Sequence, residues 1–507
     1  MMEVEGAITS NFQNGVNTDL PSLYATLQNT GCCKVCTLRF LGENEPQNYI
    51  NPYGALKNKF VFPVEHAPKI LKPNPCSACL DTLKPSFIDD TVDKVIEALN
   101  KENYDSETFN IALTLPISFY LRAHSFWFFL VSNFPFFCEV FHHNGVVVTG
   151  VKEAWKYIVI PKIEKSVNKQ YNPISDLTIS VELSYSSDYD ESLSLLKMHP
   201  NIFGPQQKKN KEKKIIFSRK SVEPALKQTN IELLRKFYEI PPPIPITSAT
   251  CKGITVQHNS IFFAGRYNKY SRTLSQTPWV LDGKRRLESS VQEIIAAPLE
   301  KLSKAEGNKF ISSGREDVDV RMLGNGRPFA LELINPHKTI FTFEELRHVE
   351  KMLNSKDVKI RDLQHIFKES LAMLKVGEES KTKNYNSYCI AWNVTPEQIH
   401  SLTTTKPLTL YQRTPVRVLH RRPAAVRERI IYWMTASVEK ICEDTIYFKL
   451  LINTQAGTYV KEFVHGDFGR TTPNLGELLG NAKVDILALD VEEIGLNWPP
   501  QVRGANL

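Results

Sequence analysis

The chain has 507 residues, of which 42% are hydrophobic and 23% are charged, and these proportions exclude collagen-like, mucin-like and wholly disordered proteins. The 62 Lys and Arg residues exceed the 55 Asp and Glu residues by seven, an excess too small to identify a polyanionic partner by itself. At about 100–200 residues per domain, the length predicts roughly two to four domains.

The N-terminal segment, MMEVEGAITSNF, has an acidic start and no apolar stretch, which is untypical of a secretory signal. We therefore expect an intracellular protein, in the nucleus, the cytoplasm or both. The nine cysteines then indicate metal binding or free thiols rather than a disulfide scaffold. The most apolar segment, Phe126 to Phe137, is about half of the ~20 residues that a membrane helix needs, and Pro135 interrupts it. We expect this segment to be buried core and the protein to have no membrane partner.

Two Cys-x-x-Cys pairs come first among the motifs, Cys33 with Cys36 and Cys76 with Cys79, with 39 residues between the pairs. Each pair can present two thiolates from one tight turn, and two such turns complete a closed tetrahedral zinc site. A closed shell leaves no position for water, so this zinc would be structural. Cys32 competes as a ligand, and ordinary buried thiols or a redox pair are the alternatives.

Two segments suggest how the chain is divided. Lys208 to Lys220 carries seven basic residues and one acidic residue, which suits an RNA contact, a nuclear address or a solvated loop. Ile240-Pro-Pro-Pro-Ile-Pro245 predicts a stiff, extended connector. We expect an N-terminal module over residues 1–265 and an α+β module over residues 266–507.

The second module begins with short β-like runs separated by sharp turns. Asn325-Gly326 lies between two runs of alternating apolar residues, which predicts a hairpin turn, with Met322 before the turn and Phe329 after it. Helical spacing of apolar residues follows over 343–353 and 363–374. Strands and helices are thus intermingled, which predicts an α+β fold on a mixed, mainly antiparallel sheet.

The segment Gly314 to Val320 places three carboxylates and one arginine in a loop that leads into the predicted hairpin. Asp317 and Asp319 could bind a divalent ion together, or one of them could be a nucleophile kept ionised by a neighbouring cation. The third possibility is a surface network of ion pairs. Asp317 lies at the end of the loop, where it can point into a cleft.

Two C-terminal segments carry further chemistry. Arg413 to Arg429 contains six arginines and a single glutamate, and arginines bind phosphates bidentately and stack on bases. Thr454 to Arg470 predicts a strand end, a glycine turn and a short helix with Val460, Phe463 and Val464 buried. Lys461 lies beside that apolar stripe and can reach a site at the edge of the sheet.

Together these segments resemble an RNA pseudouridine synthase, in particular the archaeal and eukaryotic family that acts on the T loop of tRNA. The two Cys-x-x-Cys pairs resemble the zinc site of that family, which belongs to a THUMP-containing RNA-binding domain. The resemblance is strong over most of residues 255–500 and weak over residues 80–250. It is carried by GRYNKYSRTLSQTPW (265–279), GREDVDVRMLGNGRPFALELINPH (314–337), RTPVRVLHRRP (413–423) and GTYVKEFVHGDFGRT (457–471).

The resemblance implies roles for single residues. Pseudouridine synthases share an aspartate in an R-x-D element, which here is Asp317, so Asp317 is the expected nucleophile and Asp319 becomes structural. A K-x-Y element supplies the tyrosine that stacks on the flipped uracil, which implies Tyr385, with Tyr388 and Tyr411 as rivals.

The remaining pocket residues follow from two further elements. The GTY-x-[KR] element supplies the cation near the aspartate, which here is Lys461. A leucine that closes the pocket falls in NLGELLG (474–480), as Leu478 or Leu479.

The implied activity is isomerisation of uridine to pseudouridine at position 55, position 54 or both, without a metal in catalysis or an organic cofactor. The expected cofactor is structural Zn²⁺, and the expected partners are the T-arm of tRNA and other structured RNAs, bound by a monomer. We expect the RNA to be held by Arg315, Arg413, Arg417, His420, Arg421 and Arg422.

Three rival functions are a tRNA-binding adaptor with an inactive catalytic domain, a THUMP-type methyltransferase or thiolation enzyme, and a metal-dependent nuclease. The intact R-x-D, K-x-Y and GTY-x-K elements argue against the first. The second would need a glycine-rich cofactor or pyrophosphatase loop, and neither pattern occurs in the sequence. The third would use Asp317 and Asp319 as metal ligands, and activity in EDTA would distinguish it from an isomerase.

Overall fold

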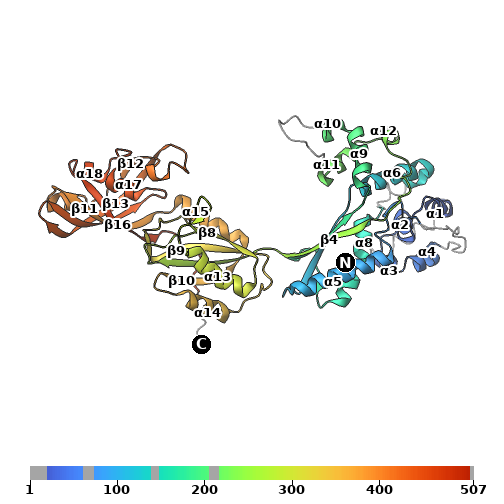
Figure 1. Cartoon of the computed structure of the whole chain (residues 1–507), viewed down its shortest axis with the longest axis horizontal. Coiled ribbons are helices and arrows are strands. Elements are labelled where there is room, and N and C mark those ends of the chain that lie inside the picture. The colour runs from blue at the N-terminus through green and yellow to red at the C-terminus, as the bar shows by residue number, and fades with distance from the viewer. Residues whose placement is uncertain (1–19, 61–73, 139–147, 205–215, 503–507) are drawn as a thin grey trace, which may run out of the picture. The chain divides into compact units, whose positions relative to one another are not determined.

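The computed structural model describes residues 20–60, 74–138, 148–204 and 216–502, and the chain divides into two compact units, Met1–Gln257 and His258–Leu507 (Figure 1). We call these unit 1 and unit 2. The predicted boundary at residue 265 lies inside strand β5 (Ile261–Lys269), eight residues beyond this division. Of the basic segment 208–220, residues 208–215 lie outside the described residues.

Unit 1 contains a four-stranded sheet in the order β2-β1-β3-β4, in which β1 pairs in parallel with both β2 and β3. The strands are β1 (Thr108–Thr114), β2 (Gln170–Tyr171), β3 (Leu177–Ser184) and β4 (Thr250–His258). The helices among the described residues are α1 (Leu20–Asn29), α2 (Lys34–Phe40), α3 (Pro46–Ile50), α4 (Pro52–Phe60), α5 (Pro85–Glu102), α6 (Ser118–Asn133), α7 (Pro135–Cys138), α8 (Val151–Ser166), α9 (Asp188–Met198), α10 (Pro200–Phe203), α11 (Arg219–Lys227) and α12 (Ile231–Phe237). The Pro-rich segment 240–245 connects α12 with β4 without regular structure, as predicted.

The apolar segment 126–137 forms the second half of α6 and most of α7, and Phe126, Leu130 and Phe137 are completely buried in the core of unit 1. This confirms the expectation of buried core. None of the helices in the described ranges is long and apolar enough to cross a membrane. Whether the unit is a THUMP domain stays a prediction.

Unit 2 is built on a ten-stranded sheet in the order β10-β5-β9-β16-β11-β14-β13-β12-β15, with β8 added beside β9. Neighbouring strands are antiparallel except β9 and β16, which are parallel, so the predicted mixed, mainly antiparallel α+β fold is confirmed. Besides β5, the strands are β8 (Gly307–Ser312), β9 (Arg321–Ile334), β10 (Val358–Ile366), β11 (Lys383–Trp392), β12 (Leu408–Arg413), β13 (Val426–Cys442), β14 (Thr445–Thr454), β15 (Thr471–Thr472) and β16 (Val484–Ile494).

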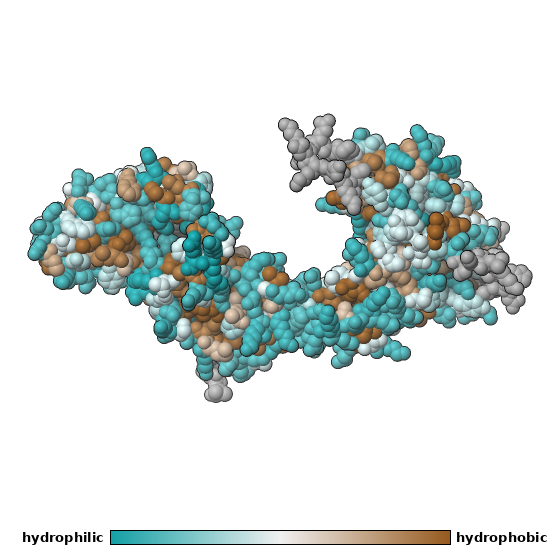
Figure 2. Space-filling model, in the orientation of Figure 1, coloured by the Kyte–Doolittle hydropathy of each residue, from teal (hydrophilic) through white to brown (hydrophobic). Residues whose placement is uncertain are grey.

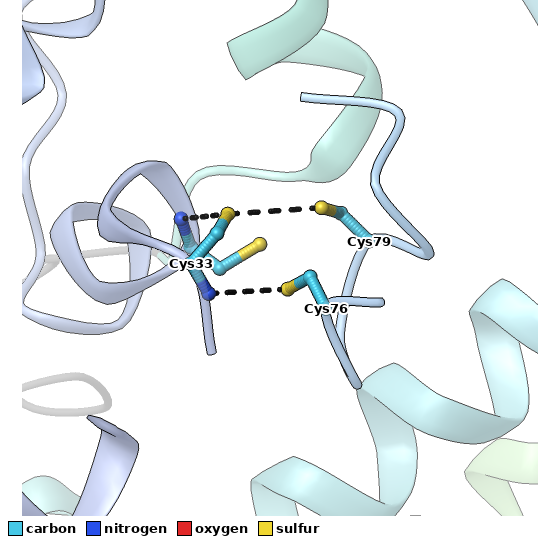
Figure 3. Close-up of side chains that lie close together, drawn as sticks. Cys33, Cys76 and Cys79 are labelled. Carbon is cyan, nitrogen blue, oxygen red and sulfur yellow. Dashed lines mark hydrogen bonds between the residues drawn. The ribbon is translucent and has the colours of Figure 1, made fainter. Parts of the chain in front are cut away.

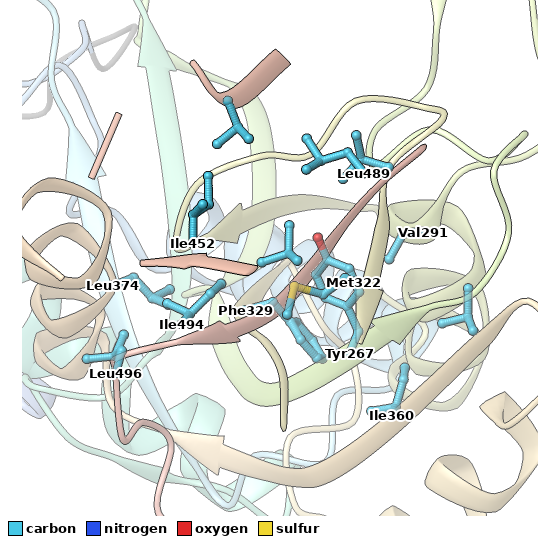
Figure 4. Close-up of a cluster of buried hydrophobic side chains, with 14 of the residues drawn as sticks. Tyr267, Val291, Met322, Phe329, Ile360, Leu374, Ile452, Leu489, Ile494 and Leu496 are labelled. Carbon is cyan, nitrogen blue, oxygen red and sulfur yellow. The ribbon is translucent and has the colours of Figure 1, made fainter. Parts of the chain in front are cut away.

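The core of unit 2 lies between this sheet and the helices that cover it (Figure 4). Buried residues of the helices α13 and α14 pack in the same cluster as Phe329 of β9 and Ile452 of β14. In the view of Figure 2, hydrophilic residues cover most of the visible face of each unit, and apolar residues form smaller patches. The helices of unit 2 are α13 (Val291–Ser303), α14 (Phe343–Leu353), α15 (Ala372–Ser380), α16 (Pro396–Ser401), α17 (Val460–His465) and α18 (Leu475–Leu478), with short 3₁₀ turns η2 (Lys368–Leu371) and η3 (Val416–Val418) and the two-stranded ribbon of β6 (Val280–Leu281) and β7 (Lys284–Arg285).

The hairpin predicted at Asn325-Gly326 is wrong, because β9 runs without reversal through this segment. Gly324 and Gly326 adopt positive φ values of 50° and 72° and make the strand irregular instead of turning it back. The reason is close backbone approach: a Cβ on Gly324 would lie 1.9 Å from the carbonyl oxygen of Glu492. The two glycines do adopt the left-handed backbone conformation expected of a turn, but they produce an irregularity within one strand.

Of the two helices predicted in this module, the first is confirmed by α14, which spans Phe343–Leu353 and begins with a capping box between Thr342 and Glu345. The second, over residues 363–374, is wrong for residues 363–371. Those residues complete β10 and form the turn η2 before α15 begins at Ala372. A short apolar run fits the helical period and the strand period equally well. Here pairing with β5 makes residues up to Ile366 a strand.

Candidate active site of unit 2

A cavity of about 280 Å³ opens at the surface of unit 2 where segments distant in sequence meet. Its walls come from the loop between β8 and β9 (residues 314–320, the acidic loop) and from the segment around η3 (residues 413–429, the arginine strip). The start of β11, the start of α17 and the middle of β16 complete them. Asp317, Tyr385 and Lys461 all line it, so the fold brings together three residues that the sequence places up to 144 positions apart (461 − 317).

A buried lysine of β5 holds the backbone at Asp317 by hydrogen bonds to its carbonyl groups. The Lys269 ammonium is completely buried and donates hydrogen bonds to the carbonyl oxygens of Asp317 and Val318 at 3.0 and 2.7 Å, and to that of Leu274 at 2.8 Å. Burial lowers the pKa of Lys269 to about 8, although the nearby Glu316, Asp319 and Asp317 oppose that shift. The Lys269 ammonium therefore holds the acidic loop in place, and the backbone carbonyl oxygens that accept its hydrogen bonds take the place of water around it.

A buried ion pair anchors the same loop on its other side. The Glu316 carboxylate accepts a hydrogen bond from Arg327 Nε at 2.7 Å and from the Tyr267 hydroxyl at 2.8 and 3.0 Å. Both charged side chains are nearly inaccessible to solvent, so neither has water to replace its partner. Glu316 therefore anchors the loop through this ion pair, and Asp317, next to it in sequence, lines the cavity.

Two cations face the Asp317 carboxylate. Arg417 Nη1 lies 2.9 Å from Asp317 Oδ2, whereas Lys461 Nζ lies 3.5 Å from the same oxygen. Lys461 instead bonds both oxygens of Asp319, at 2.8 and 2.7 Å. Of these two cations, Arg417 of the arginine strip is therefore the nearer to Asp317. The sequence predicts Arg417 only as an RNA-binding residue.

The surroundings of both cations agree with this arrangement. Burial raises the pKa of Asp319, but the hydrogen bonds from Lys461 outweigh it and the pKa is lowered. Arg417 is oriented by Glu462 of α17, whose buried Oε1 accepts from Arg417 Nε at 2.7 Å. Both aspartates are thus paired with side-chain cations, which suits an ionised nucleophile better than a pair of metal ligands.

Tyr385 lies on β11 and lines the cavity, whereas its rivals Tyr388 and Tyr411 do not and are 37% and 51% exposed. Burial raises the pKa of Tyr385, so its hydroxyl stays protonated at neutral pH. A second aromatic residue, Tyr459 of the GTY element, also lines the cavity and was not singled out from the sequence.

The structure does not place the predicted pocket leucine at the cavity. Leu478, at the end of α18, is 36% exposed, and Leu479 is buried in the core, so neither lines the cavity. The leucine that does line it is Leu489 of β16, next but one to Val491, which also lines it. The sheet turns alternate residues of β16 to this side, a placement that depends on strand order and that the local sequence cannot show.

Of the predicted RNA-binding residues, four line the cavity, namely Arg315, Arg417, Arg421 and Arg422. Arg413 and His420 are exposed on the same strip but do not line the cavity. Two further arginines of the strip, Arg427 and Arg429 on β13, line it as well. The positive charge therefore concentrates around the carboxylate, and it attracts polyanions.

Unit 1 holds the four predicted zinc ligands in one cluster. Figure 3 labels three of them, Cys33, Cys76 and Cys79, whose side chains lie close together. Cys33 caps the N-terminus of α2 and Cys36 follows within it, while Cys76 and Cys79 come from the turn before α5. All four sulfur atoms lie within 4.8 Å of one another, and Cys33 Sγ lies 3.8 Å from Cys79 Sγ. Four thiolates at 2.3 Å from a tetrahedral zinc lie about 3.8 Å apart, so the donor set fits this ion.

The surroundings of the cysteine cluster also suit a bound cation. Arg39 is buried and donates from Nη1 to Cys36 Sγ at 3.3 Å, which partly balances the negative charge of four thiolates. Cys32, the competing ligand, is outside the cluster. Four sulfurs could hold a metal ion here, and that ion would join two segments that are 39 residues apart.

Comparison with known protein families identifies both units. The family model described as "Pus10, C-terminal" matches residues 262–495, and the model described as "Eukaryotic Pus10, N-terminal" matches residues 76–256.

Curated relatives agree with these matches. The chain is 39% identical over 432 residues to the tRNA pseudouridine synthase Pus10 of Homo sapiens, covering 84% of this chain and 79% of the relative. It is 39% identical over 429 residues to the protein of the same description from Xenopus laevis, covering 84% and 81%. With the corresponding protein of Archaeoglobus fulgidus it shares 38% identity over 248 residues, which are 46% of this chain and 67% of the relative.

Among solved structures, a chain of a Cbf5-Nop10-Gar1 complex aligns with 16% identity and a TM-score of 0.24, covering 45% of this chain and 47% of that chain.

Proposed function

The chain belongs to the Pus10 family of tRNA pseudouridine synthases. We propose that it isomerises uridine in the T loop of tRNA, at position 55, position 54 or both, with Asp317 as the nucleophile. Membership makes it an RNA pseudouridine synthase whose substrate is tRNA. The observation that carries the residue assignment is the cavity in which Asp317, paired with Arg417 and flanked by Lys461, lies with Tyr385.

The reaction moves the uracil from a carbon–nitrogen to a carbon–carbon bond. The bond between C1′ and N1 breaks, and its electron pair leaves with the uracil. Asp317 either attacks C1′ or removes a sugar proton while the base is detached, and both routes need the ionised carboxylate. Arg417 and Lys461 place positive charge beside this carboxylate, at 2.9 and 3.5 Å from its Oδ2. The base then rotates and C5 bonds to C1′. In the first route the Asp317–C1′ bond breaks as this bond forms, and in the second the proton returns from Asp317 to the sugar. C5 finally loses its proton, and N1 gains one.

Tyr385 supplies the platform for the base. The target uridine must leave the stack, at a cost of a few kcal/mol, before its glycosidic bond is accessible. An aromatic side chain that lines the cavity repays part of this cost by stacking on the exposed uracil. Because Tyr385 is protonated at neutral pH, it adds no negative charge beside Asp317.

The arginine strip holds the RNA around the flipped nucleotide. Arg421 and Arg422 are exposed at the cavity, and Arg427 and Arg429 line it from β13. Arg413 and His420 extend the same basic surface along the chain. Guanidinium groups bind phosphates bidentately. Several such contacts together make the affinity for RNA strongly dependent on salt concentration.

The cysteine cluster of unit 1 is assigned to structural Zn²⁺. Four thiolates supply a closed shell that stabilises the fold and leaves no ligand position for water or substrate. Cys33 and Cys76 each come from a different segment, so the ion would act as a cross-link within unit 1. Asp317 and the cations paired with it, Arg417 and Lys461, all belong to unit 2, so the proposed reaction does not involve the cysteine cluster.

A site-mapped pseudouridine assay on unmodified tRNA transcripts tests this proposal. Chemical mapping should place new pseudouridine at position 54 or 55 and at no position outside the T loop. The same reaction after brief EDTA treatment should run at the untreated rate and leave the RNA uncut. Pseudouridine elsewhere would contradict the T-loop assignment, and RNA cleavage that EDTA abolishes would favour the nuclease.

A further inference from the structure

A second buried lysine, unlike Lys269, lines the cavity, and the proposed reaction does not use it. Lys383 is the first residue of β11 and is only 7% exposed, yet it is among the side chains that form the cavity wall. Its burial differs from that of Lys269, whose ammonium is solvated by three backbone carbonyls. Lys383 Nζ makes no hydrogen bond or ion pair with any residue in the part of the chain that the structure describes.

An ammonium group in this state is costly, because burial removes most of its water and no residue in the described ranges replaces it. Burial, with the neighbouring Arg327 adding to it, lowers the pKa of Lys383 to about 8, and Glu378, which also lines the cavity, opposes the shift. A large apolar residue would avoid this cost, so the lysine needs a partner that arrives from outside the chain.

A glycine directly beside Lys383 leaves the ammonium accessible from within the cavity. Gly314 has a φ of +85°, and a Cβ there would lie 3.2 Å from Lys383 Nζ and 3.1 Å from Arg327 Nη1. The absent side chain therefore keeps the space beside the lysine open. Arg327 is already paired with Glu316, so Lys383 is the donor at this place that has no acceptor.

The position of Lys383 relative to Tyr385 identifies the acceptor. The two residues are separated by one position on β11, so they share a face of the strand and their Cα atoms lie about 7 Å apart. A base stacked on Tyr385 would have its edge within reach of a lysine side chain extended from the neighbouring position. The exposed arginines at the mouth already supply donors for phosphates, whereas a buried donor beside the ring platform faces the base.

We propose that the Lys383 ammonium donates a hydrogen bond to a carbonyl oxygen of the target uracil and stabilises the charge that the base acquires when its bond to C1′ breaks. This inference rests on the proposed function of the cavity. The electron pair of the broken bond enters the uracil ring and is shared by N1 with the O2 and O4 oxygens. Lys383 keeps its proton throughout, so the proton lost from C5 and the proton gained by N1 balance without it.

The first test compares Lys383→Met with wild type in single-turnover reactions at saturating enzyme. Methionine fills the site without a charge, and removal of one such donor from a developing anion slows chemistry by about 10²–10³-fold. We expect that loss with unchanged tRNA affinity, and we expect Lys383→Arg to recover part of the rate because it restores a charged donor. Lys309→Met on β8, a lysine that is 64% exposed, is the matched control and should react like wild type.

The second test identifies the carbonyl by combining each protein with transcripts that carry 2-thiouridine or 4-thiouridine at the target. Sulfur is a weak acceptor, so the thio substitution at the bonded position slows wild type and Lys383→Arg but has no further effect on Lys383→Met. Because this coupling compares substrates on one protein, it is independent of how well each variant folds.

The inference is overturned if Lys383→Met reacts at the wild-type rate, or if both thio effects persist unchanged in that variant. It is also overturned if the loss appears only as weaker tRNA binding, which would mean a phosphate contact. These outcomes differ from failure of the proposed function, in which wild-type protein itself forms no pseudouridine in the T loop.

Discussion

Replacing Arg417 with Met removes the guanidinium nearest to the proposed nucleophile, and we expect this change to slow catalysis more than replacing Lys461 with Met. The sequence resemblance assigns the cation to Lys461, but the distances to Asp317 Oδ2 are 2.9 Å for Arg417 and 3.5 Å for Lys461. The two variants therefore separate what the structure shows from what the motif alone implies.

The magnitudes follow from the contacts. A hydrogen bond to a charged group contributes about 1.5–3 kcal/mol, and the Asp317 and Arg417 side chains are more than a third exposed, which favours the lower end. At about 1.4 kcal/mol for a tenfold change, Arg417→Met should lower the single-turnover rate constant by about 10- to 30-fold. Lys461→Met should lower it by less than about fivefold, because its main partner is the exposed Asp319.

The assay is single-turnover formation of pseudouridine at saturating enzyme, with tRNA affinity and thermal unfolding measured on the same proteins. Arg417→Met also leaves the buried Glu462 without its cation, so the double variant with Glu462→Gln is the control for that second effect. A rate loss that persists in the double variant belongs to Asp317. A larger loss in Lys461→Met than in Arg417→Met would mean that Lys461, and not Arg417, is the cation on which Asp317 depends.

Two further predictions concern the metal cluster and the buried lysines. Cys76→Ser should lose bound zinc and unfold at lower temperature, whereas Cys32→Ser should keep its zinc, as checked by metal analysis and thermal unfolding; wild-type protein that is zinc-free and of normal stability would contradict this. The rate constant should fall as pH rises through about 8, because Lys269 and Lys383 act as cations and lose their protons there. Lys383→Arg stays charged and should show a shallower fall in a single-turnover pH profile; an equally steep fall in both proteins would exclude Lys383 as its source.

Much of the site was predictable because its motifs carry residues of fixed chemistry. The segments around Asp317, Tyr385 and Lys461 were recognised separately, and the sheet brings all three to one cavity. The two Cys-x-x-Cys pairs likewise predicted a cluster that the fold of unit 1 assembles.

What the sequence could not predict depends on neighbours that are distant along the chain. Arg417 is aimed at Asp317 by Glu462 of α17, and Leu489 reaches the cavity because of the position of β16 in the sheet. The failed hairpin has the same origin, since Gly324 is required by the approach of Glu492 on a neighbouring strand. Lys269 lies in one of the recognised segments, but its three backbone acceptors become visible only in the folded chain.

The proposed function depends above all on the Asp317 carboxylate, which we propose performs the isomerisation. The most direct test is site-mapped pseudouridine formation by Asp317→Asn on unmodified tRNA transcripts, beside wild type. Asparagine keeps the size of the side chain but cannot act as an ionised nucleophile, so we expect no pseudouridine and nearly unchanged tRNA binding. Conversion of T-loop uridine by purified Asp317→Asn would contradict the assignment.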